Sequence, residues 1–198
     1  MICLELLGMS RSGKTTQKKR LQDKLSEDGL NIVTLERPKI PFSEFDSLAE
    51  FHDFLINFFS EKINANQDKD VIILDRGLYD RQVLLDFDYS NFALSLQEYS
   101  QLRTKIQQSL PEISRGYVFM ISPEESLMRW GAQKAQGLDY SHLNGGLNSG
   151  DTVEGLTRLY QIYQSFLYDP KLQEVEGLAS KEGISRKILE GLPNATKR

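Results

Sequence analysis

Apolar runs and segments with helical periodicity alternate along the whole chain. Continuous runs such as Val-Ile-Ile-Leu at 71–74 are typical of strands that are buried on both faces of a parallel sheet. On this pattern we expect five strands, at 2–7, 31–36, 71–74, 116–122 and, with the weakest pattern, 172–178. Strands that alternate with helices predict an α/β fold with a doubly wound parallel five-stranded sheet, whose ligands bind beyond the carboxyl ends of the strands.

The segments between the predicted strands carry apolar residues at helical spacing. Helices are expected at about 14–28 and 181–189, and another begins at Pro123 with Ser122 as its N-cap. Stripes of aromatic and aliphatic residues at helical spacing run through 48–59, 99–106 and 156–167. We interpret these stripes as the core-facing sides of helices, because helical spacing by itself predicts a buried face.

Length and composition fit one compact domain. The chain has 198 residues without an internal repeat or a linker, so we expect a single domain over 1–198 with a small lid at about 129–150. The net charge of −4 argues against extended nucleic acid as a partner, and the short basic cluster at 18–20 is interpreted as a solvated helix face. The single cysteine, Cys3, allows neither an intramolecular disulfide nor a cysteine-based metal site.

The apolar runs also bear on location. None approaches the length needed to span a membrane, and the first run is expected to be a core strand rather than a signal peptide. We therefore expect a cytoplasmic protein with no membrane partner, and leave open whether it forms a homodimer.

The most specific chemistry follows the first predicted strand. Residues 8–15, Gly-Met-Ser-Arg-Ser-Gly-Lys-Thr, match the phosphate-binding pattern G-x-x-x-x-G-K-S/T between a strand and a helix. The glycines let backbone N–H groups point at phosphate oxygens, Lys14 supplies charge to the β- and γ-phosphates, and the Thr15 hydroxyl is a hard ligand for Mg²⁺. The residues expected to bind a nucleotide are Gly8, Ser10, Arg11, Ser12, Gly13, Lys14, Thr15 and Thr16. A glycine-rich turn without a ligand is the weaker interpretation, because of the flanking strand and helix.

A charged cluster follows the third predicted strand, at the same end of the sheet. Asp75 can hold Mg²⁺ or accept a proton from an attacking hydroxyl, so we assign it to metal binding and catalysis. Arg76 and Arg81 can bind phosphate or stabilise transition-state charge, and Tyr79 joins them as a candidate substrate contact. The alternative is a surface turn whose charges pair with one another.

Two further segments carry candidate site residues. Glu36 and Arg37 end the second strand and are candidate contacts to the acceptor substrate, although an ion pair of Glu36 with neighbouring cations is an equal alternative. Arg129 is a candidate catalytic cation at the base of the lid, whereas Lys134 is interpreted as solvated. Residues 137–150 are rich in Gly, Asn and Ser, a composition tolerated in a lid that moves to exclude water.

Taken in order, these segments resemble the thymidylate kinase and deoxynucleoside kinase group of P-loop phosphotransferases. The shared features are the phosphate loop, a third strand ending in Asp-Arg, a Pro-Glu-Glu-x-Leu-x-Arg helix before the lid, and a final Leu-Ala-Ser-Lys-Glu-Gly-Ile segment. The resemblance implies that Asp75 and Arg76 are the paired residues after the third strand, that Arg129 is the lid-helix arginine, and that Ala179 lies beside the adenine of ATP. The chain departs from thymidylate kinases at 36–38, which lacks their two glycines, and at 55–67, which lacks their base-holding arginine segment. The acceptor base therefore stays open.

These observations predict a kinase that uses Mg²⁺ and ATP and transfers the γ-phosphoryl group to a nucleoside monophosphate such as dTMP, or to a nucleoside. Several arginines beside one carboxylate slightly favour a phosphate acceptor, because an anionic phosphate needs cations and a hydroxyl needs a base. A kinase of another small-molecule or polynucleotide hydroxyl and a regulatory P-loop ATPase remain alternatives. A GTP-binding switch is disfavoured, since neither Asp-x-x-Gly after the third strand nor Asn-Lys-x-Asp occurs.

Overall fold

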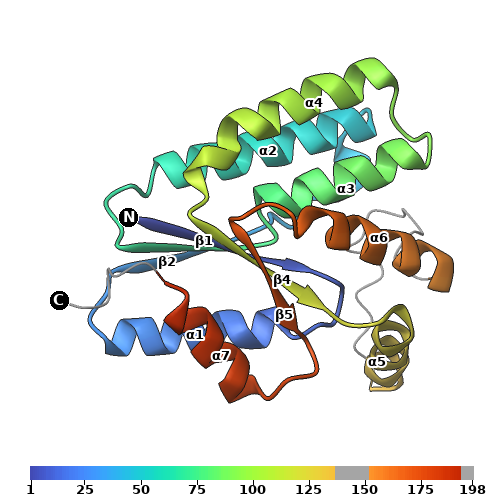
Figure 1. Ribbon diagram of the computed structural model, residues 1–198. Coiled ribbons are helices and arrows are strands. Elements are labelled where there is room, and N and C mark those ends of the chain that lie inside the picture. Colours follow the sequence, from blue (N-terminus) through green and yellow to red (C-terminus); the bar gives the residue numbers. More distant parts are fainter. Residues whose placement is uncertain (137–151, 193–198) are drawn as a thin grey trace.

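The chain folds around one parallel sheet (Figure 1). The computed structural model describes residues 1–136 and 152–192. Its strands are β1 (Ile2–Gly8), β2 (Ile32–Glu36), β3 (Val71–Asp75), β4 (Arg115–Met120) and β5 (Leu172–Glu176). They lie in the order β2-β3-β1-β4-β5, and every neighbouring pair is parallel. The predicted five-stranded sheet is confirmed, with each strand within two residues of its predicted bounds.

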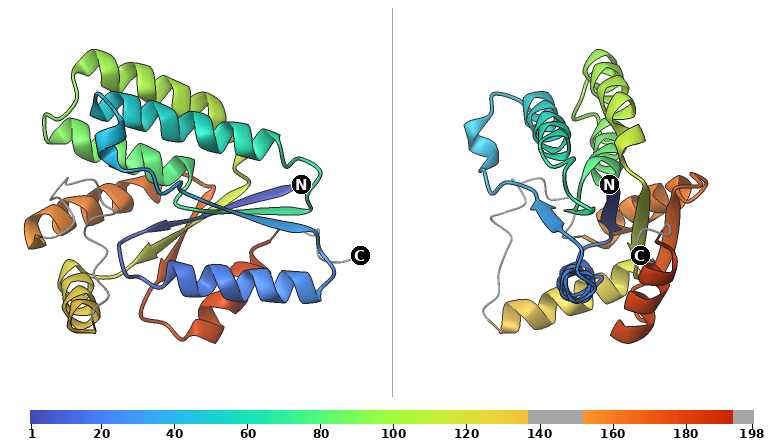
Figure 2. Two further views of the ribbon diagram at one scale, coloured as in Figure 1. Left: turned by 180° about the vertical axis from the view of Figure 1, so that it is seen from behind. Right: turned by 90° about the vertical axis from the view of Figure 1, so that its left-hand side faces the viewer.

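Helices cover both faces of the sheet (Figures 1 and 2). They are α1 (Lys14–Glu27), α2 (Leu48–Asn64), α3 (Leu78–Ser90), α4 (Leu96–Ser109), α5 (Pro123–Ala135), α6 (Val153–Phe166) and α7 (Lys181–Glu190), with short 3-10 helices η1 (Phe42–Glu44) and η2 (Leu110–Glu112). Side chains of β1 alternate between two hydrophobic cores, so that Leu4 and Leu6 pack with α1 and α7 while Cys3 and Leu7 pack on the side of α2, α3, α4 and α6. In the part of the chain that the structure describes, no helix combines the length and the apolar character needed to cross a membrane.

Most of the helix signals in the sequence are confirmed. The helix predicted at Pro123 begins there, and the side chain of Ser122 accepts a hydrogen bond from the Glu125 N–H at its start. Helices α1 and α7 also begin where they were predicted. Residues 137–150, which carry most of the predicted lid, lie outside the described residues.

Helix α3 was not predicted. The sequence presents 75–81 as a charged cluster, and the alternative interpretation was a surface turn. In the structure the strand ends at Asp75, α3 begins at Leu78, and the side chains of Asp80 and Arg81 are buried, with 0% and 2% exposure. The surface position in this alternative is therefore wrong, because these charges are enclosed between α3 and its neighbours. The mutual pairing in it is observed, since Asp80 lies 3.3 Å from Arg76 and 3.9 Å from Arg81.

A buried carboxylate joins β1 to the start of α3. Glu5, in the middle of β1, is fully buried, and its two carboxylate oxygens accept hydrogen bonds from the backbone N–H groups of Tyr79 (2.9 Å) and Asp80 (2.8 Å). Helix α3 has no side-chain N-cap of its own, so Glu5 satisfies donors that a helix N-terminus otherwise leaves unpaired. Burial raises the pKa of Glu5 from its ordinary value of 4.5 to about 8. Glu5 thus fixes where α3 starts, and its carboxyl group titrates near physiological pH.

The first prediction concerns the pH dependence of stability. Between about pH 4.5 and 8 the folded state holds a proton on Glu5 that the unfolded state releases. The contribution of protonated Glu5 to the free energy of unfolding is therefore complete below about pH 4.5 and is lost as the pH rises through about 8. Glu5→Gln cannot titrate. Compared with this variant, we expect the free energy of unfolding of the wild type to fall more steeply across this window, by about 1 kcal/mol per pH unit. Urea denaturation of both proteins from about pH 5 to 8 measures the difference, and parallel curves would contradict the assignment.

Candidate active site

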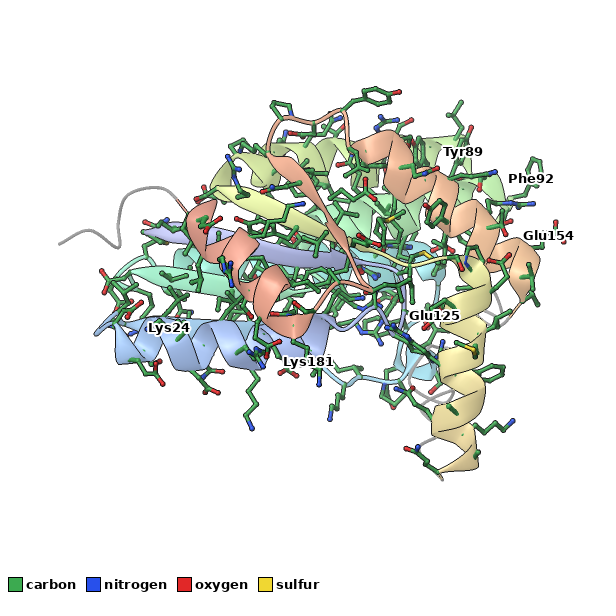
Figure 3. The ribbon with its side chains drawn as sticks, turned by 60° about the horizontal axis from the view of Figure 1, so that its bottom comes forward. Lys24, Tyr89, Phe92, Glu125, Glu154 and Lys181 are labelled. Carbon is green, nitrogen blue, oxygen red and sulfur yellow. The ribbon has the colours of Figure 1, made fainter. Side chains whose placement is uncertain are left out.

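A cavity of about 650 Å³ lies beyond the carboxyl ends of β1 and β3. Its walls come from the phosphate loop and the start of α1, from the two residues at the end of β3, from α5, and from the segment between β5 and α7. The predicted site residues that line it are Arg11, Ser12, Gly13, Lys14, Thr15, Thr16, Asp75, Arg76, Arg129 and Ala179. Figure 3 shows Glu125 on α5 and Lys181 at the start of α7, the two helices that flank the cavity. The structure therefore gathers ten of the predicted site residues around one space, whereas Gly8 and Ser10 of the predicted nucleotide-binding set do not line it.

The backbone of the phosphate loop requires glycine at two positions. Gly8 has a φ of 120°, and a Cβ atom there would lie 2.3 Å from the carbonyl oxygen of Phe119 on β4. Gly13, directly before α1, has a φ of 96°. The N–H of Met9 also donates to the Phe119 carbonyl (3.0 Å), which ties the loop to β4. The loop is thus held in a curled shape at the N-terminus of α1, a place that favours bound anions.

Lys14 is folded back onto its own loop. Its ammonium group donates hydrogen bonds to the Gly8 carbonyl (3.0 Å), the Met9 carbonyl and the Ser12 hydroxyl (3.2 Å). Burial, followed by the nearby charge of Arg76, holds the pKa of Lys14 well below its ordinary value. No carboxylate in the described part of the chain lies within ion-pair distance of Lys14. An anion that enters the loop would supply the charged partner that Lys14 lacks.

Thr15 and Asp75 fit a metal that arrives with phosphates. Both residues line the cavity, and their hydroxyl and carboxylate oxygens are the hard ligands that Mg²⁺ prefers. Within residues 1–136 and 152–192 there is no cluster of three or more His, Cys, Asp or Glu side chains that could hold a metal ion. Mg²⁺ usually keeps few protein ligands and takes the rest from water and substrate phosphates, so this sparse donor set fits it.

Lys18 is buried, contrary to the prediction that 18–20 forms a solvated face. It lies on α1 with its side chain 10% exposed, and its ammonium group donates to the Asp75 carboxylate (2.9 Å) and to Glu36. Burial works against this charge, but the hydrogen bonds to Glu36 and Asp75 raise the pKa of Lys18 above its ordinary value. Only Lys19 in the cluster is fully in solvent. Glu36 therefore has a cation as partner, and the partner comes from α1.

A second charged network surrounds Asp80. The Asp80 carboxylate accepts hydrogen bonds from the Tyr163 hydroxyl (2.6 Å) and from Arg76 (3.3 Å), and Arg81 lies 3.9 Å away. Burial opposes its ionisation, yet the charges of Arg76 and Arg81 hold the pKa of Asp80 below its ordinary value. Arg76 is also one of three non-glycine residues in the described ranges with positive φ, at 65°. Asp80 thus fixes the position of Arg76 at the cavity wall.

Three arginines lie in the electrostatic surroundings of Asp80. Burial, followed by the charges of Arg81 and Arg76, lowers the pKa of Arg37 to about 10, while Asp75 also acts on Arg76 and Asp88 on Arg81. Arg81 is 2% exposed, and its Nε atom has no hydrogen-bond partner in the described part of the chain. A buried guanidinium N–H group of this kind favours an anionic or strongly polar ligand nearby.

Of the five predicted substrate contacts, Arg76 lines the cavity, and Glu36 is paired with the cavity residue Asp75 across β2 and β3. Glu36, Arg37, Tyr79 and Arg81 do not line the 650 Å³ cavity. Tyr79 is buried and its hydroxyl donates to the Asp169 carboxylate (2.8 Å). Substrate binding by these residues remains a prediction.

Helix α5 docks onto the phosphate loop through three side chains. Arg129 donates to the Arg11 carbonyl (2.9 Å), and the Ser126 hydroxyl donates to the Ser10 carbonyl (3.1 Å). The guanidinium group of Arg11 lies 5.4 Å from the ring centroid of Trp130, within the range of a cation–π contact. Because Trp130 is the single tryptophan of the chain, its fluorescence can report changes at the loop.

Sequence reasoning missed several residues that shape the site. They are Glu5, Lys18, Asp80, Trp130 and Tyr163. A signal existed for Lys18, which lies four residues after Lys14 and therefore on the same side of α1. Glu5 and Tyr163 form hydrogen bonds with residues more than 70 positions away in the sequence, and a local sequence pattern does not predict such partners.

Comparisons with known proteins identify the fold. No family model and no curated protein matches the chain. Three solved structures of deoxyadenosine kinase from M. mycoides are similar to it: with dCMP and a flexible dCDP bound (TM-score 0.71, 15% identity), with bound dATP (0.68, 16%) and with bound dCTP (0.65, 16%). Each alignment covers 96% of this chain and 97% or 98% of the other. The chain therefore has the fold of the P-loop deoxynucleoside kinases.

Proposed function

We propose that the chain is an ATP-dependent nucleoside kinase that transfers the γ-phosphoryl group of ATP to a nucleoside. The observation that carries the proposal is the composition of one cavity, where a loop lysine without a carboxylate partner meets Asp75, Arg76 and Arg129. The similar deoxyadenosine kinase structures, which contain dATP, dCTP or dCMP, support a nucleotide as ligand.

In this proposal the phosphate loop and α1 bind the donor. The triphosphate of ATP accepts hydrogen bonds from loop N–H groups and takes Lys14 as its cation, while adenine lies beside Ala179 between β5 and α7. Thr15 and Asp75 hold Mg²⁺, which neutralises phosphate charge when it is bound. These residues position the γ-phosphoryl group for in-line transfer.

Two arginines serve the transfer step. Arg76, held by Asp80, reaches the cavity from the end of β3, and Arg129, held by Glu125 and the Arg11 carbonyl, reaches it from α5. Charge on the equatorial oxygens of the transferring group is stabilised by cations of this kind, and most of the catalytic effect in phosphoryl transfer comes from such positioning. Helix α5 and the lid proposed for 129–150 exclude water from the site.

The acceptor side favours a hydroxyl. Glu36 and Asp75 are paired residues of neighbouring strands, and the Glu36 side chain is 58% exposed, whereas that of Asp75 is 14% exposed. With Asp75 engaged by the metal, the second carboxylate oxygen of Glu36, whose Oε1 accepts a hydrogen bond from Lys18, would accept the proton of a nucleoside hydroxyl, a role that a single carboxylate could not combine with metal binding. Arg37, Tyr79 and Arg81 are the residues we assign to the rest of the acceptor.

A nucleoside monophosphate, including dTMP, is the second candidate acceptor. The observation in its favour is that three guanidinium groups, those of Arg37, Arg76 and Arg81, lie in the surroundings of Asp80. A phosphate acceptor is already anionic at neutral pH and needs these cations more than it needs a base.

The second prediction tests the function itself. Purified protein with Mg²⁺ and ATP should release ADP when one nucleoside or nucleoside monophosphate of a panel is added, and Lys14→Ala should lower this turnover by about 1,000-fold or more because the γ-phosphate loses its cation. A coupled ADP assay over deoxynucleosides, ribonucleosides, their monophosphates and 5′-hydroxyl oligonucleotides provides the measurement.

Circular dichroism and thermal melting show whether Lys14→Ala keeps the fold. Wild-type turnover by a folded Lys14→Ala protein would overturn the proposal. ADP release that no acceptor accelerates would instead indicate an ATPase. Stimulation only by an oligonucleotide would move the function to a polynucleotide kinase.

The third prediction separates the role of Arg129 from donor binding. Arg129→Ala should lower kcat by about 100-fold while the Kd for ATP changes by less than about threefold, because the charge acts mainly in the transition state. The titration of Trp130 fluorescence with ATP gives Kd, and the coupled assay gives kcat.

Arg103→Ala is the matched control, since Arg103 is an exposed arginine on α4 away from the cavity. It should leave both constants unchanged. A weaker Kd for ATP with an unchanged kcat in Arg129→Ala would place Arg129 in donor binding and exclude the catalytic role.

A further inference from the structure

Lys18 occupies an unusual place for a charged side chain. It lies on α1 one turn after Lys14, and its ammonium group contacts the carboxylates of Asp75 and Glu36 while its side chain is 10% exposed. On the same helix face, Leu21 and Leu25 are fully buried in the core, which fixes α1 against the sheet. The backbone of Lys18 is therefore fixed relative to the two strands that carry the carboxylates.

The two carboxylates are brought together by the sheet. Glu36 of β2 and Asp75 of β3 are directly paired in parallel register. Like charges at paired positions repel each other, and both residues end their strands at the same edge. The ammonium group of Lys18 contacts one oxygen of each and so lies where a bridging cation would lie.

Without Lys18, this pair would be a ligand set for a metal. Two carboxylates on neighbouring strands, close to the start of α1 and its Thr15 hydroxyl, offer hard oxygen ligands to a divalent cation. We propose that Lys18 is an internal counter-ion that keeps the Glu36–Asp75 pair from binding a divalent cation in the nucleotide-free protein, so that the metal binds only together with the nucleotide. The inference rests on the proposed function, which assigns the metal to Asp75.

The hydrogen bonding of Asp75 allows Lys18 and a nucleotide-bound metal to contact the same carboxylate. Lys18 engages Oδ2 of Asp75, and Oδ1 accepts no hydrogen bond within the part of the chain that the structure describes. A metal that brings phosphate oxygens with it needs only one oxygen of Asp75, so Lys18 can stay in place. A metal without nucleotide would need both carboxylates, and there it competes with a fixed positive charge.

The experiment measures Mn²⁺ binding to nucleotide-free protein, with the electron paramagnetic resonance signal of free Mn²⁺ as the readout. Nucleotide-free wild type should leave the signal of free Mn²⁺ unchanged. Lys18→Met, which keeps the length of the side chain but removes its charge, should bind Mn²⁺ alone about tenfold to a hundredfold more tightly than wild type. Lys18→Arg keeps the charge and should behave as wild type.

Controls assign the new binding to the carboxylate pair. Lys19→Met removes an equal charge from the exposed neighbour and should leave Mn²⁺ binding unchanged. Lys18→Met combined with Asp75→Asn should lose the added binding. If Lys18→Met does not fold, as judged by circular dichroism, Lys18→Gln and the wild-type titration still decide the question.

Two results would overturn the proposal. One is a folded Lys18→Met or Lys18→Gln protein that binds Mn²⁺ no better than wild type. The other is wild-type protein that binds Mn²⁺ without nucleotide at a site abolished by Asp75→Asn. Neither depends on an acceptor, so an inactive kinase panel with the expected Mn²⁺ pattern would reject the proposed function alone, and an active panel with the wrong pattern would reject the role of Lys18 alone.

Discussion

The parallel register of β2, β3 and β1 determines where the charged groups of the site lie. Asp75 is paired with Leu6 on one side and with Glu36 on the other, so β1 runs on into the phosphate loop directly beside the two carboxylates. Side chains alternate along a strand, and a slip of one residue in any of these strands would turn its carboxylate to the other face. The hydrophobic residues that set the register, such as Ile72 and Leu74, therefore also set the distance between the candidate metal ligand and the phosphate loop.

The interior next to the site is charged, and each buried charge depends on another element. Glu5 of β1 holds the first turn of α3, and α3 in turn presents Asp80 to Arg76 and to Tyr163 of α6. A buried charge without a partner lowers the stability of the fold, so loss of one member would leave the remaining charges uncompensated and destabilise the protein. The arrangement couples the position of Arg76 at the cavity wall to strands and helices far apart in the sequence.

The sequence alone is enough to predict the sheet, because short continuous apolar runs that alternate with helical segments indicate strands buried in a parallel sheet. The phosphate-loop residues that line the cavity were predictable for a different reason: the pattern that ends in Lys14-Thr15 is specific, and its flanking strand and helix were visible. Helix α3 was not predictable from its pattern, since Tyr79, Asp80 and Arg81 look like a polar turn until partners from β1 and α6 enclose them. Lys18 was misread for a similar reason. A run of basic residues on a helix does not tell which of them faces inward, and the carboxylates that receive Lys18 come from two other strands.

The two lysines of α1 show how one helix can separate the duties of two cations. Lys14 is buried among neutral carbonyl and hydroxyl oxygens, and its pKa is lowered, whereas Lys18 has two carboxylates and a raised pKa. A cation that already has anionic partners gains little from a further anion, while one held only by neutral groups gains a full charge pair. Under the proposed function, an entering triphosphate would therefore gain more from Lys14 than from Lys18, one turn away on the same helix.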